Sequence, residues 1–170
     1  MSCGTSIYHL IFNDEHLENF TADFKMLPPL RTKEDQIALI EGIKKGVVDV
    51  ITSNHQPHEN EIMEVEFPIA PMGCIGTQIA FPMALTYLLD ELDLETIVKT
   101  MSINPRTILQ TDIPVIKEGF VANLTLFDTH TEWKFDKSSN SSLSENTPML
   151  DSTLKGKVHG TILGNYLHFS

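Results

Sequence analysis

Short apolar runs alternate with amphipathic segments along the first two-thirds of the chain. Segments 4–12 and 47–53 are rich in aliphatic and β-branched residues, which is typical of buried strands. Apolar residues at helical spacing predict helices elsewhere, at 33–45, 78–89, 94–102 and from Asn104. Strands that alternate with helices in this way predict an α/β fold.

The expected helix 33–45 has recognisable ends. Thr32 is a suitable N-cap, and Gly46 is a suitable stop. A stripe of apolar residues should face the core: Ile37, Leu39, Ile40 and Ile43.

The pattern changes after residue 114. Segment 120–128 alternates like a half-buried strand, and segment 155–169 predicts two strands joined by a turn at Gly164 and Asn165. Segment 138–146 is polar and weakly patterned, so we expect a mobile loop there.

Length limits what these elements can build. A complete α/β barrel needs about 250 residues, and this chain has 170. We therefore expect residues 1–114 to be the C-terminal part of a barrel domain. Residues 115–170 would add strands of a small β-sandwich.

Composition excludes several function classes. The formal net charge of −11 argues against nucleic acid as a partner. No segment is long and apolar enough to span a membrane, and the first residues lack a signal-peptide pattern. Cys3 and Cys74 are far apart and form no disulfide framework, so we expect free thiols and a cytoplasmic protein.

The strand 47–53 ends in a polar segment that begins with Asn54 and contains His55 and His58. Residues just past the C-terminal ends of barrel strands form active sites. An aspartate at the first position could bind a metal and accept a proton, whereas a neutral amide is a poor ligand and no base. The position of segment 54–58 is typical of an active site, but Asn54 lacks the carboxylate that the chemistry would need.

Six collinear segments resemble motifs of bacterial dihydroorotases, which belong to the amidohydrolase superfamily. The family motifs are T-P-H-H-L, M-N-P-P-L-R, D-H-A-P-H, A-P-x-G before G-L-E-T, A-E-G-A-D-A-D-L-V-L-F-D and T-L-K-G-R-V. Their counterparts here are residues 6–10, 26–31, 54–58, 70–79, 117–128 and 153–158. The resemblance covers nearly the whole chain, but only about the C-terminal two-fifths of such an enzyme. The chain is then either a piece of a longer product or a remnant.

The departures from the family fall on chemical positions. Tyr8 stands where the resemblance implies a metal-binding histidine, and Leu27 where it implies an asparagine that contacts substrate. Asn54 stands where it implies the aspartate that binds metal and shuttles the proton. Loss of the shuttle alone should cost a factor on the order of 10² to 10⁴ in rate.

Other family positions are retained. The resemblance implies that His58 contacts the substrate's carboxylate side and that the backbone of Pro71 and Gly73 lies against the substrate ring. The family's H-x-H pair, its Asp or modified Lys ligand and its further His ligand have no counterparts in the chain. We therefore expect no metal cofactor, and zinc only if the protein is active.

Each candidate side chain has a second interpretation. His55 and His58 could bind metal, but a hydrogen-bonded loop is the commoner role for two histidines in a loop. Asn54 could hold a water or a substrate amide, or could simply cap its loop. His9 could replace the ligand missing at Tyr8, although neighbours on a strand should point to opposite faces.

Three functions remain open. The leading hypothesis is a non-catalytic, dihydroorotase-like partner or scaffold in pyrimidine synthesis, for example of aspartate transcarbamoylase. The second is an active metal-dependent dihydroorotase that hydrolyses dihydroorotate to N-carbamoyl-aspartate. The third is a module that binds a pyrimidine-like acid without turnover. In each case unpaired strand edges should require the rest of the polypeptide, a partner chain or an oligomer.

Overall fold

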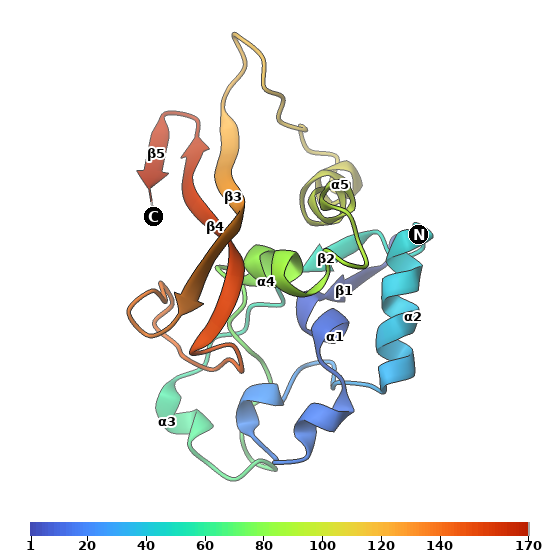
Figure 1. Ribbon diagram of the computed structural model, residues 1–170, viewed down its shortest axis with the longest axis vertical. Coiled ribbons are helices and arrows are strands. Elements are labelled where there is room, and N and C mark those ends of the chain that lie inside the picture. The colour runs from blue at the N-terminus through green and yellow to red at the C-terminus, as the bar shows by residue number, and fades with distance from the viewer. Residues whose placement is uncertain (170) are drawn as a thin grey trace.

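The computed structural model describes residues 1–169 (Figure 1). Its helices are α1 (Ile7–Ile11), α2 (Lys33–Lys44), α3 (Asn60–Met63), α4 (Ala80–Tyr87), α5 (Leu94–Val98) and α6 (Asn104–Ile108). Shorter helical turns are η1 (Asp14–Leu17), η2 (Ala22–Phe24) and the π-helical η3 (Lys99–Ile103). The strands are β1 (Gly4–Ser6), β2 (Val50–Thr52), β3 (Asn123–Phe135), β4 (Ser152–Leu163) and β5 (Tyr166–Phe169).

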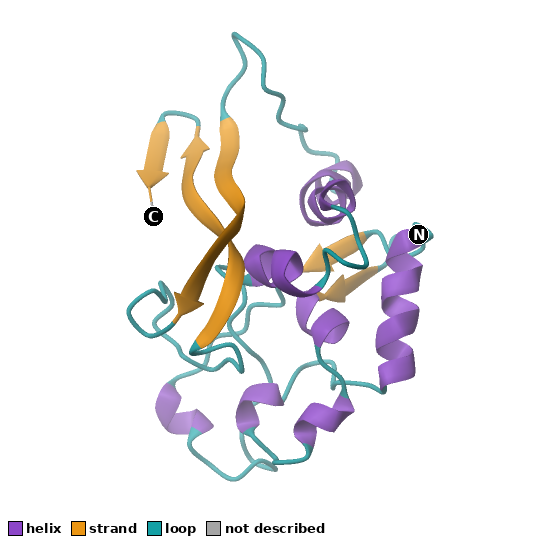
Figure 2. Ribbon diagram, viewed as in Figure 1, coloured by secondary structure: helices purple, strands orange, loops and turns teal. Residues whose placement is uncertain are grey.

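The chain forms a mixed α/β structure with two separate sheets (Figure 2). β1 and β2 are parallel and in register from Gly4 opposite Val50 to Ser6 opposite Thr52. Because two strands cannot close on themselves, this pair does not form a barrel. The strand pair lies among α1, α2, α4 and α5, with the second sheet on the far side of α4 (Figure 1).

The first predicted strand, 4–12, is wrong beyond Ser6. The strand is three residues long, and the chain then turns into α1, whose first turn is capped by the Ser6 hydroxyl accepting a hydrogen bond from the Tyr8 amide. A buried apolar run of this length suits either a strand or a buried helix. The expectation that His9 and Tyr8 point to opposite faces of a strand is therefore also wrong.

Helix α2 confirms the predicted span and cap. The Thr32 hydroxyl accepts a hydrogen bond from the Asp35 amide. The predicted buried stripe is only partly confirmed, because Ile43 is buried while Ile37 is 53% exposed. The face around Ile37 has no neighbour in residues 1–169 that covers it.

The later helices lie close to their expected positions. Helix α4 is slightly shorter than the predicted 78–89 and contains Pro82 in its first turn. The helices expected at 94–102 and from Asn104 run on without a break as α5, η3 and α6. A π-helical turn, in which the hydrogen bonds span five residues, joins them.

The second sheet is antiparallel, in the order β3–β4–β5. The predicted strand 120–128 is longer than expected, and the two strands predicted within 155–169 are confirmed together with their turn at Gly164. In Figure 1 a long connection leads from α6 to β3. The second sheet lies beside the helices and does not continue the β1–β2 pair.

One hydrophobic core joins both parts of the chain. Ile79 and Met83 of the α4 region belong to the same buried cluster as Phe135, Met149 and Leu154 of the C-terminal part. The division at residue 114 stays a prediction, and the shared core shows that the two parts are packed against each other.

Segment 138–146 is irregular, as expected of a loop, but it is hydrogen-bonded to the rest of the chain, and its mobility stays a prediction. The Gln78 side chain donates to the Ser139 carbonyl at 2.6 Å and accepts from the Ser141 amide at 2.7 Å. Ser144 and Asn146 are buried. The segment has no regular secondary structure, and hydrogen bonds from polar side chains to its backbone hold it in position instead.

No helix within residues 1–169 combines the length and the apolar character needed to cross a membrane.

Gly156 gives a test of the contact between α4 and β4. Its φ of +85° is unfavourable for other residues, and a Cβ there would overlap the side chain of Leu85, which is 1% exposed. Gly119 has a similar φ of +83° but nothing within 4 Å of an added Cβ. We expect Gly156→Ala to lower the free energy of unfolding by roughly 2–4 kcal/mol and Gly119→Ala by about 1 kcal/mol, since only the first adds overpacking to backbone strain. Urea denaturation measures both, and equal losses would show that Leu85 yields without cost.

Candidate functional site

The polar segment 54–58 follows the C-terminal end of β2, and α1 follows the C-terminal end of the neighbouring β1. A third stretch joins them, because His55 forms a parallel bridge with Cys74. The structure thus brings together residues 6–10, 54–58 and 70–79, three stretches that the sequence predicts to lie at one site.

Tyr8 is fully buried at this point. Its phenol donates a hydrogen bond to the Ile75 carbonyl and lies 3.2 Å from the Thr147 hydroxyl. Burial, followed by the proximity of Cys74, raises the pKa of the phenol far above its usual range. A phenol that stays protonated and bonded to a carbonyl does not act as a metal ligand.

Asn54 has a left-handed backbone with φ of +47°, which asparagine tolerates better than most residues. Its side-chain amide donates to the Leu27 carbonyl at 2.8 Å, and its side-chain oxygen accepts from Gln56 at 3.4 Å. The group at the family's aspartate position therefore ties the loop after β2 to the segment around Leu27. Whether Asn54 has a functional role beyond this stays a prediction.

His55 also holds the loop. Its Nδ1 accepts hydrogen bonds from the amides of Gly76 at 3.0 Å and Thr77 at 3.3 Å. A nitrogen that accepts from amides must be unprotonated, so the ring is neutral in this arrangement.

His58 and Gly73, which the resemblance connects with substrate, lie side by side. Nε2 of His58 donates to the Met72 carbonyl at 2.9 Å. Gly73 has φ of +131°, and a Cβ there would lie 2.6 Å from Cβ of Gln56 and 3.2 Å from His58 Nε2. Only glycine fits this contact, while the neighbouring Pro71 is half-buried. Substrate binding by His58, Pro71 and Gly73 stays a prediction.

Asn146 fastens these loops together from a distant part of the chain. Its side-chain nitrogen donates to the carbonyls of Gln56 and Gly73, both at 2.9 Å. Its side-chain oxygen accepts from the His58 amide at 3.2 Å, and its backbone carbonyl accepts from the Ile75 amide at 3.0 Å. One buried carboxamide thus joins both loops of the site.

Lys25 supports the loop that leads to Gly73. Its ammonium donates to the carbonyls of Phe67 at 2.6 Å, Pro68 at 3.1 Å and Ala70 at 2.6 Å. Its backbone carbonyl accepts from the Gly73 amide at 2.8 Å.

The side chains of His9 and Cys74 are also buried near the site, and neither is available for chemistry there. His9 is buried, and its Nε2 donates to the Pro28 carbonyl at 2.9 Å, so it does not take the place of a ligand at Tyr8. Cys74 is buried, and burial, followed by the charge of Asp23, raises the pKa of its thiol far above its usual range. A thiol in that state is a poor nucleophile.

The donor set does not fit zinc. Within residues 1–169 no three His, Cys, Asp or Glu side chains lie close enough to hold one metal ion. The Tyr8 phenol and the Asn54 side-chain nitrogen direct hydrogen atoms at carbonyl oxygens. The Asn54 side-chain oxygen accepts from Gln56, and an amide oxygen is not among the nitrogen, sulfur and carboxylate ligands that zinc prefers.

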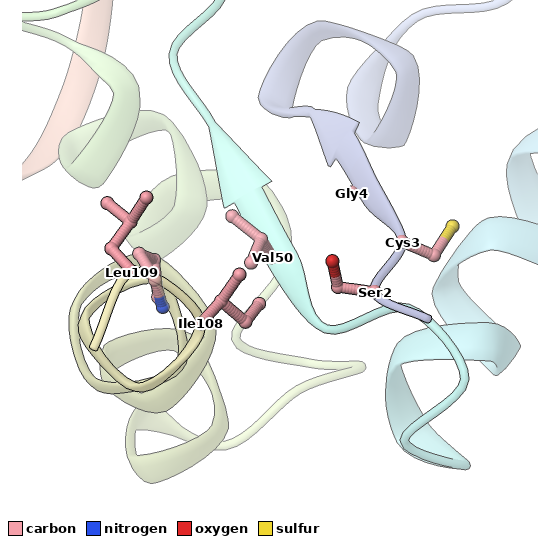
Figure 3. A pocket seen from close by; sticks show the side chains of 7 residues that line it. Ser2, Cys3, Gly4, Val50, Ile108 and Leu109 are labelled. Carbon is pink, nitrogen blue, oxygen red and sulfur yellow. The ribbon is translucent and has the colours of Figure 1, made fainter.

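A small cavity of about 240 Å³ lies at the other end of the strand pair, against α6 (Figure 3). It is lined by Ser2, Cys3, Gly4, Val50, Pro105, Ile108 and Leu109. Because it opens at the N-terminal ends of β1 and β2, it is separate from the candidate site, and features at that end of such folds usually serve stability.

Comparison with known proteins gives a clear relationship in sequence. No family model matches the chain. The dihydroorotase of Aquifex aeolicus is 39% identical over 166 residues, which are 95% of this chain and 38% of that protein. The dihydroorotase of Ruminiclostridium cellulolyticum is 37% identical over 96% of this chain and 39% of its own length. The chain is dihydroorotase-like. It spans about two-fifths of the length of these curated relatives.

Solved structures confirm the fold of the dihydroorotase-like chain. The L-hydantoinase of Arthrobacter aurescens superposes with a TM-score of 0.84 at 24% identity, over 98% of this chain and 38% of the hydantoinase. An inactive dihydroorotase-like domain of the Chaetomium thermophilum CAD-like multifunctional protein superposes with a TM-score of 0.68 at 19% identity, over 98% of this chain and 43% of the other. The chain therefore has the fold of the C-terminal part of an amidohydrolase.

Sequence reasoning missed the residues that hold the site of the dihydroorotase-like chain together. Lys25 directly precedes the segment 26–31, which gave a signal for its position but not for its three carbonyl partners. Asn146 gave no signal, because its partners His58 and Gln56 lie 88 and 90 residues away.

Asn146 is the most sensitive position of the site. We expect Asn146→Ala to lower the free energy of unfolding by roughly 2–4 kcal/mol, because it leaves the buried carbonyl of Gly73 and the part-buried backbone groups of Gln56 and His58 without their partner. Asn140→Ala is the matched control. It removes only short-range bonds to Ser142 and Ser144 and should cost about 1 kcal/mol. Chemical denaturation of both variants checks this, and equal costs would contradict the fastening role.

Proposed function

We propose that this dihydroorotase-like chain is non-catalytic and acts as a structural or regulatory partner in pyrimidine biosynthesis. One observation carries the proposal. The Tyr8 phenol and the Asn54 side-chain nitrogen, at the two family ligand positions, are already bonded to the carbonyls of Ile75 and Leu27, and the Asn54 side-chain oxygen accepts from Gln56. Neither side chain is free to hold a metal or to move a proton.

Other features support the same proposal. His58 is retained, but its Nε2 donates to Met72 rather than into an open site. Leu27 replaces a substrate-contacting asparagine and is 48% exposed. An inactive dihydroorotase-like domain also exists among the structural neighbours, which gives a precedent for this kind of protein.

The need for a partner follows from what the chain leaves uncovered. Within the described residues β1 and β2 pair only with each other, so each has an open edge. Large apolar side chains lie on the surface, among them Val121 at 78%, Leu109 at 72% and Ile69 at 71% exposure. Open edges and apolar surface favour association.

We propose that the partner is the remainder of the same polypeptide or a separate chain, with aspartate transcarbamoylase the leading candidate, in an oligomer. The exposed Cys3 and the buried Cys74 are both free. Free thiols agree with a reducing compartment, and the cytoplasm is the location we propose.

Turnover tests the absence of catalysis. We expect the natural product, supplied with zinc, to hydrolyse dihydroorotate no faster than its Asn54→Ala variant, because the family's proton-shuttling carboxylate is lacking. The reaction is followed by the formation of N-carbamoyl-aspartate. Turnover that Asn54→Ala or Tyr8→Phe abolishes would contradict the proposal and favour a rebuilt active site.

Purification from the native cell tests the partner. We expect a tagged chain expressed at its natural level to retain a transcarbamoylase subunit, and the 170-residue chain alone to associate or to remain incompletely folded, because of its open edges. Mass spectrometry and light scattering measure the two outcomes. A monodisperse, fully folded monomer that retains no transcarbamoylase would rule out the scaffold role.

A further inference from the structure

A large cavity separates the two layers of the chain. Its volume is about 1020 Å³, and its walls come from α4, η3 and α6 on one side and from β3, β4 and β5 on the other. No residue of β1, β2 or α1 lines it. None of the candidate site residues Asn54, His58 and Gly73 lines it.

The walls are largely apolar and are joined to each other. Phe81 of α4 and Phe127 of β3 are in edge-to-face contact, with ring centroids 4.7 Å apart. Met101 and Trp133 also line the cavity, and the indole nitrogen of Trp133 donates to the Gly156 carbonyl at 3.2 Å. These contacts fix aromatic surface in place before any ligand arrives.

The charge of the lining is opposite to the charge of the chain. The formal net charge is −11, with 23 acidic residues. Yet no Asp or Glu is among the described residues that line the cavity, while Arg106, Lys157 and His168 are. The cavity is therefore a basic pocket in an acidic protein.

The positive charges of Arg106 and Lys157 are not paired with a carboxylate in the part of the chain that the structure describes. Arg106 donates through Nη1 to the backbone and hydroxyl oxygens of Ser102, and no carboxylate within the described residues forms an ion pair with it. Lys157 is half-buried and likewise forms no ion pair there. Asp128 lies opposite Lys157 across the sheet, but its carboxylate accepts from the amides of His130 and Thr131.

We propose that this cavity is a binding site for a small organic anion with an apolar body. Its volume is at the upper end of the range of roughly 300–1,000 Å³ for small-molecule sites. Aromatic walls suit the apolar body, and the half-buried cations on opposite walls suit a carboxylate or sulfonate, since a partly buried charge gains most from an opposite partner. Tyr8, Asn54, His58 and Gly73 do not line the cavity, although its wall residue Thr77 also donates to His55, so the proposal does not depend on the proposed loss of catalysis.

A pair of matched dyes tests the site on the longest natural product of the gene, purified with any partner that it retains. Anilinonaphthalene sulfonate is an apolar anion, and N-phenylnaphthylamine is its neutral analogue. Trp133 lines the cavity, so energy transfer that is lost in a Trp133→Phe variant reports dye bound near it, and the variants below assign the dye to the cavity. We expect the protein to bind the sulfonate at least about fivefold more tightly than the neutral dye, with energy transfer from Trp133.

Charge-neutral variants assign the preference to the cavity. Lys157→Gln should remove about fivefold of sulfonate affinity and leave the neutral dye unchanged, and Arg106→Gln should act in the same direction. Lys155→Gln is the control, because Lys155 lies on the same strand but does not line the cavity. Equal affinity for the two dyes, equal losses at Lys155 and Lys157, or sulfonate binding without energy transfer from Trp133 would each overturn the proposal.

Discussion

The phenol of Tyr8 donates its hydrogen bond to the Ile75 carbonyl at the point where β1 and β2 end. The surrounding loops are arranged around this contact, because it lies in the core and a buried hydroxyl without a partner is costly. A histidine at the same position would need another partner for its ring nitrogens. The resemblance to dihydroorotases implies a metal as that partner, whereas here the partner is the backbone of the chain itself. The substitution has therefore changed how the strand ends are held together.

The rest of the site follows the same rule, that each buried polar group is satisfied within the chain. Asn146 binds the backbone of both loops, and Lys25 gathers three carbonyls of the loop that precedes Gly73. Within the described residues no buried side-chain nitrogen or oxygen is left without a partner. A catalytic centre usually keeps groups that are poised for a substrate. This region has the character of a hydrogen-bonded core, which agrees with the scaffold role that we propose.

The sequence predicts those features that depend on local spacing. Helix α2 follows from its Thr32 cap and apolar stripe, and the β4–β5 hairpin follows from its turn residues. Segment 7–11 is a helix where the sequence pattern predicts a strand, because a short apolar run does not distinguish a buried strand from a buried helix. The exposure of Ile37 could not be foreseen, since burial depends on neighbours rather than on periodicity.

The candidate site shows a similar limit. Its positions, Tyr8 and Asn54 among them, could be located by their resemblance to family motifs, but the direction of their hydrogen bonds could not. The role of Asn146 could not be predicted from the sequence. Its partners are far away along the chain, and it binds their backbone, which carries no residue-specific signal. The basic cavity between the two layers could not be predicted either, because its walls come from segments that are distant in sequence and share no motif.

Zinc content measured by elemental analysis on the longest natural product of this gene tests the central claim most directly. The product should be purified without chelators and in the presence of added zinc. With Tyr8 and Asn54 bonded to the backbone, we predict far less than one equivalent per chain. One or two tightly held equivalents would contradict this and would show that the strand ends still carry a metal centre.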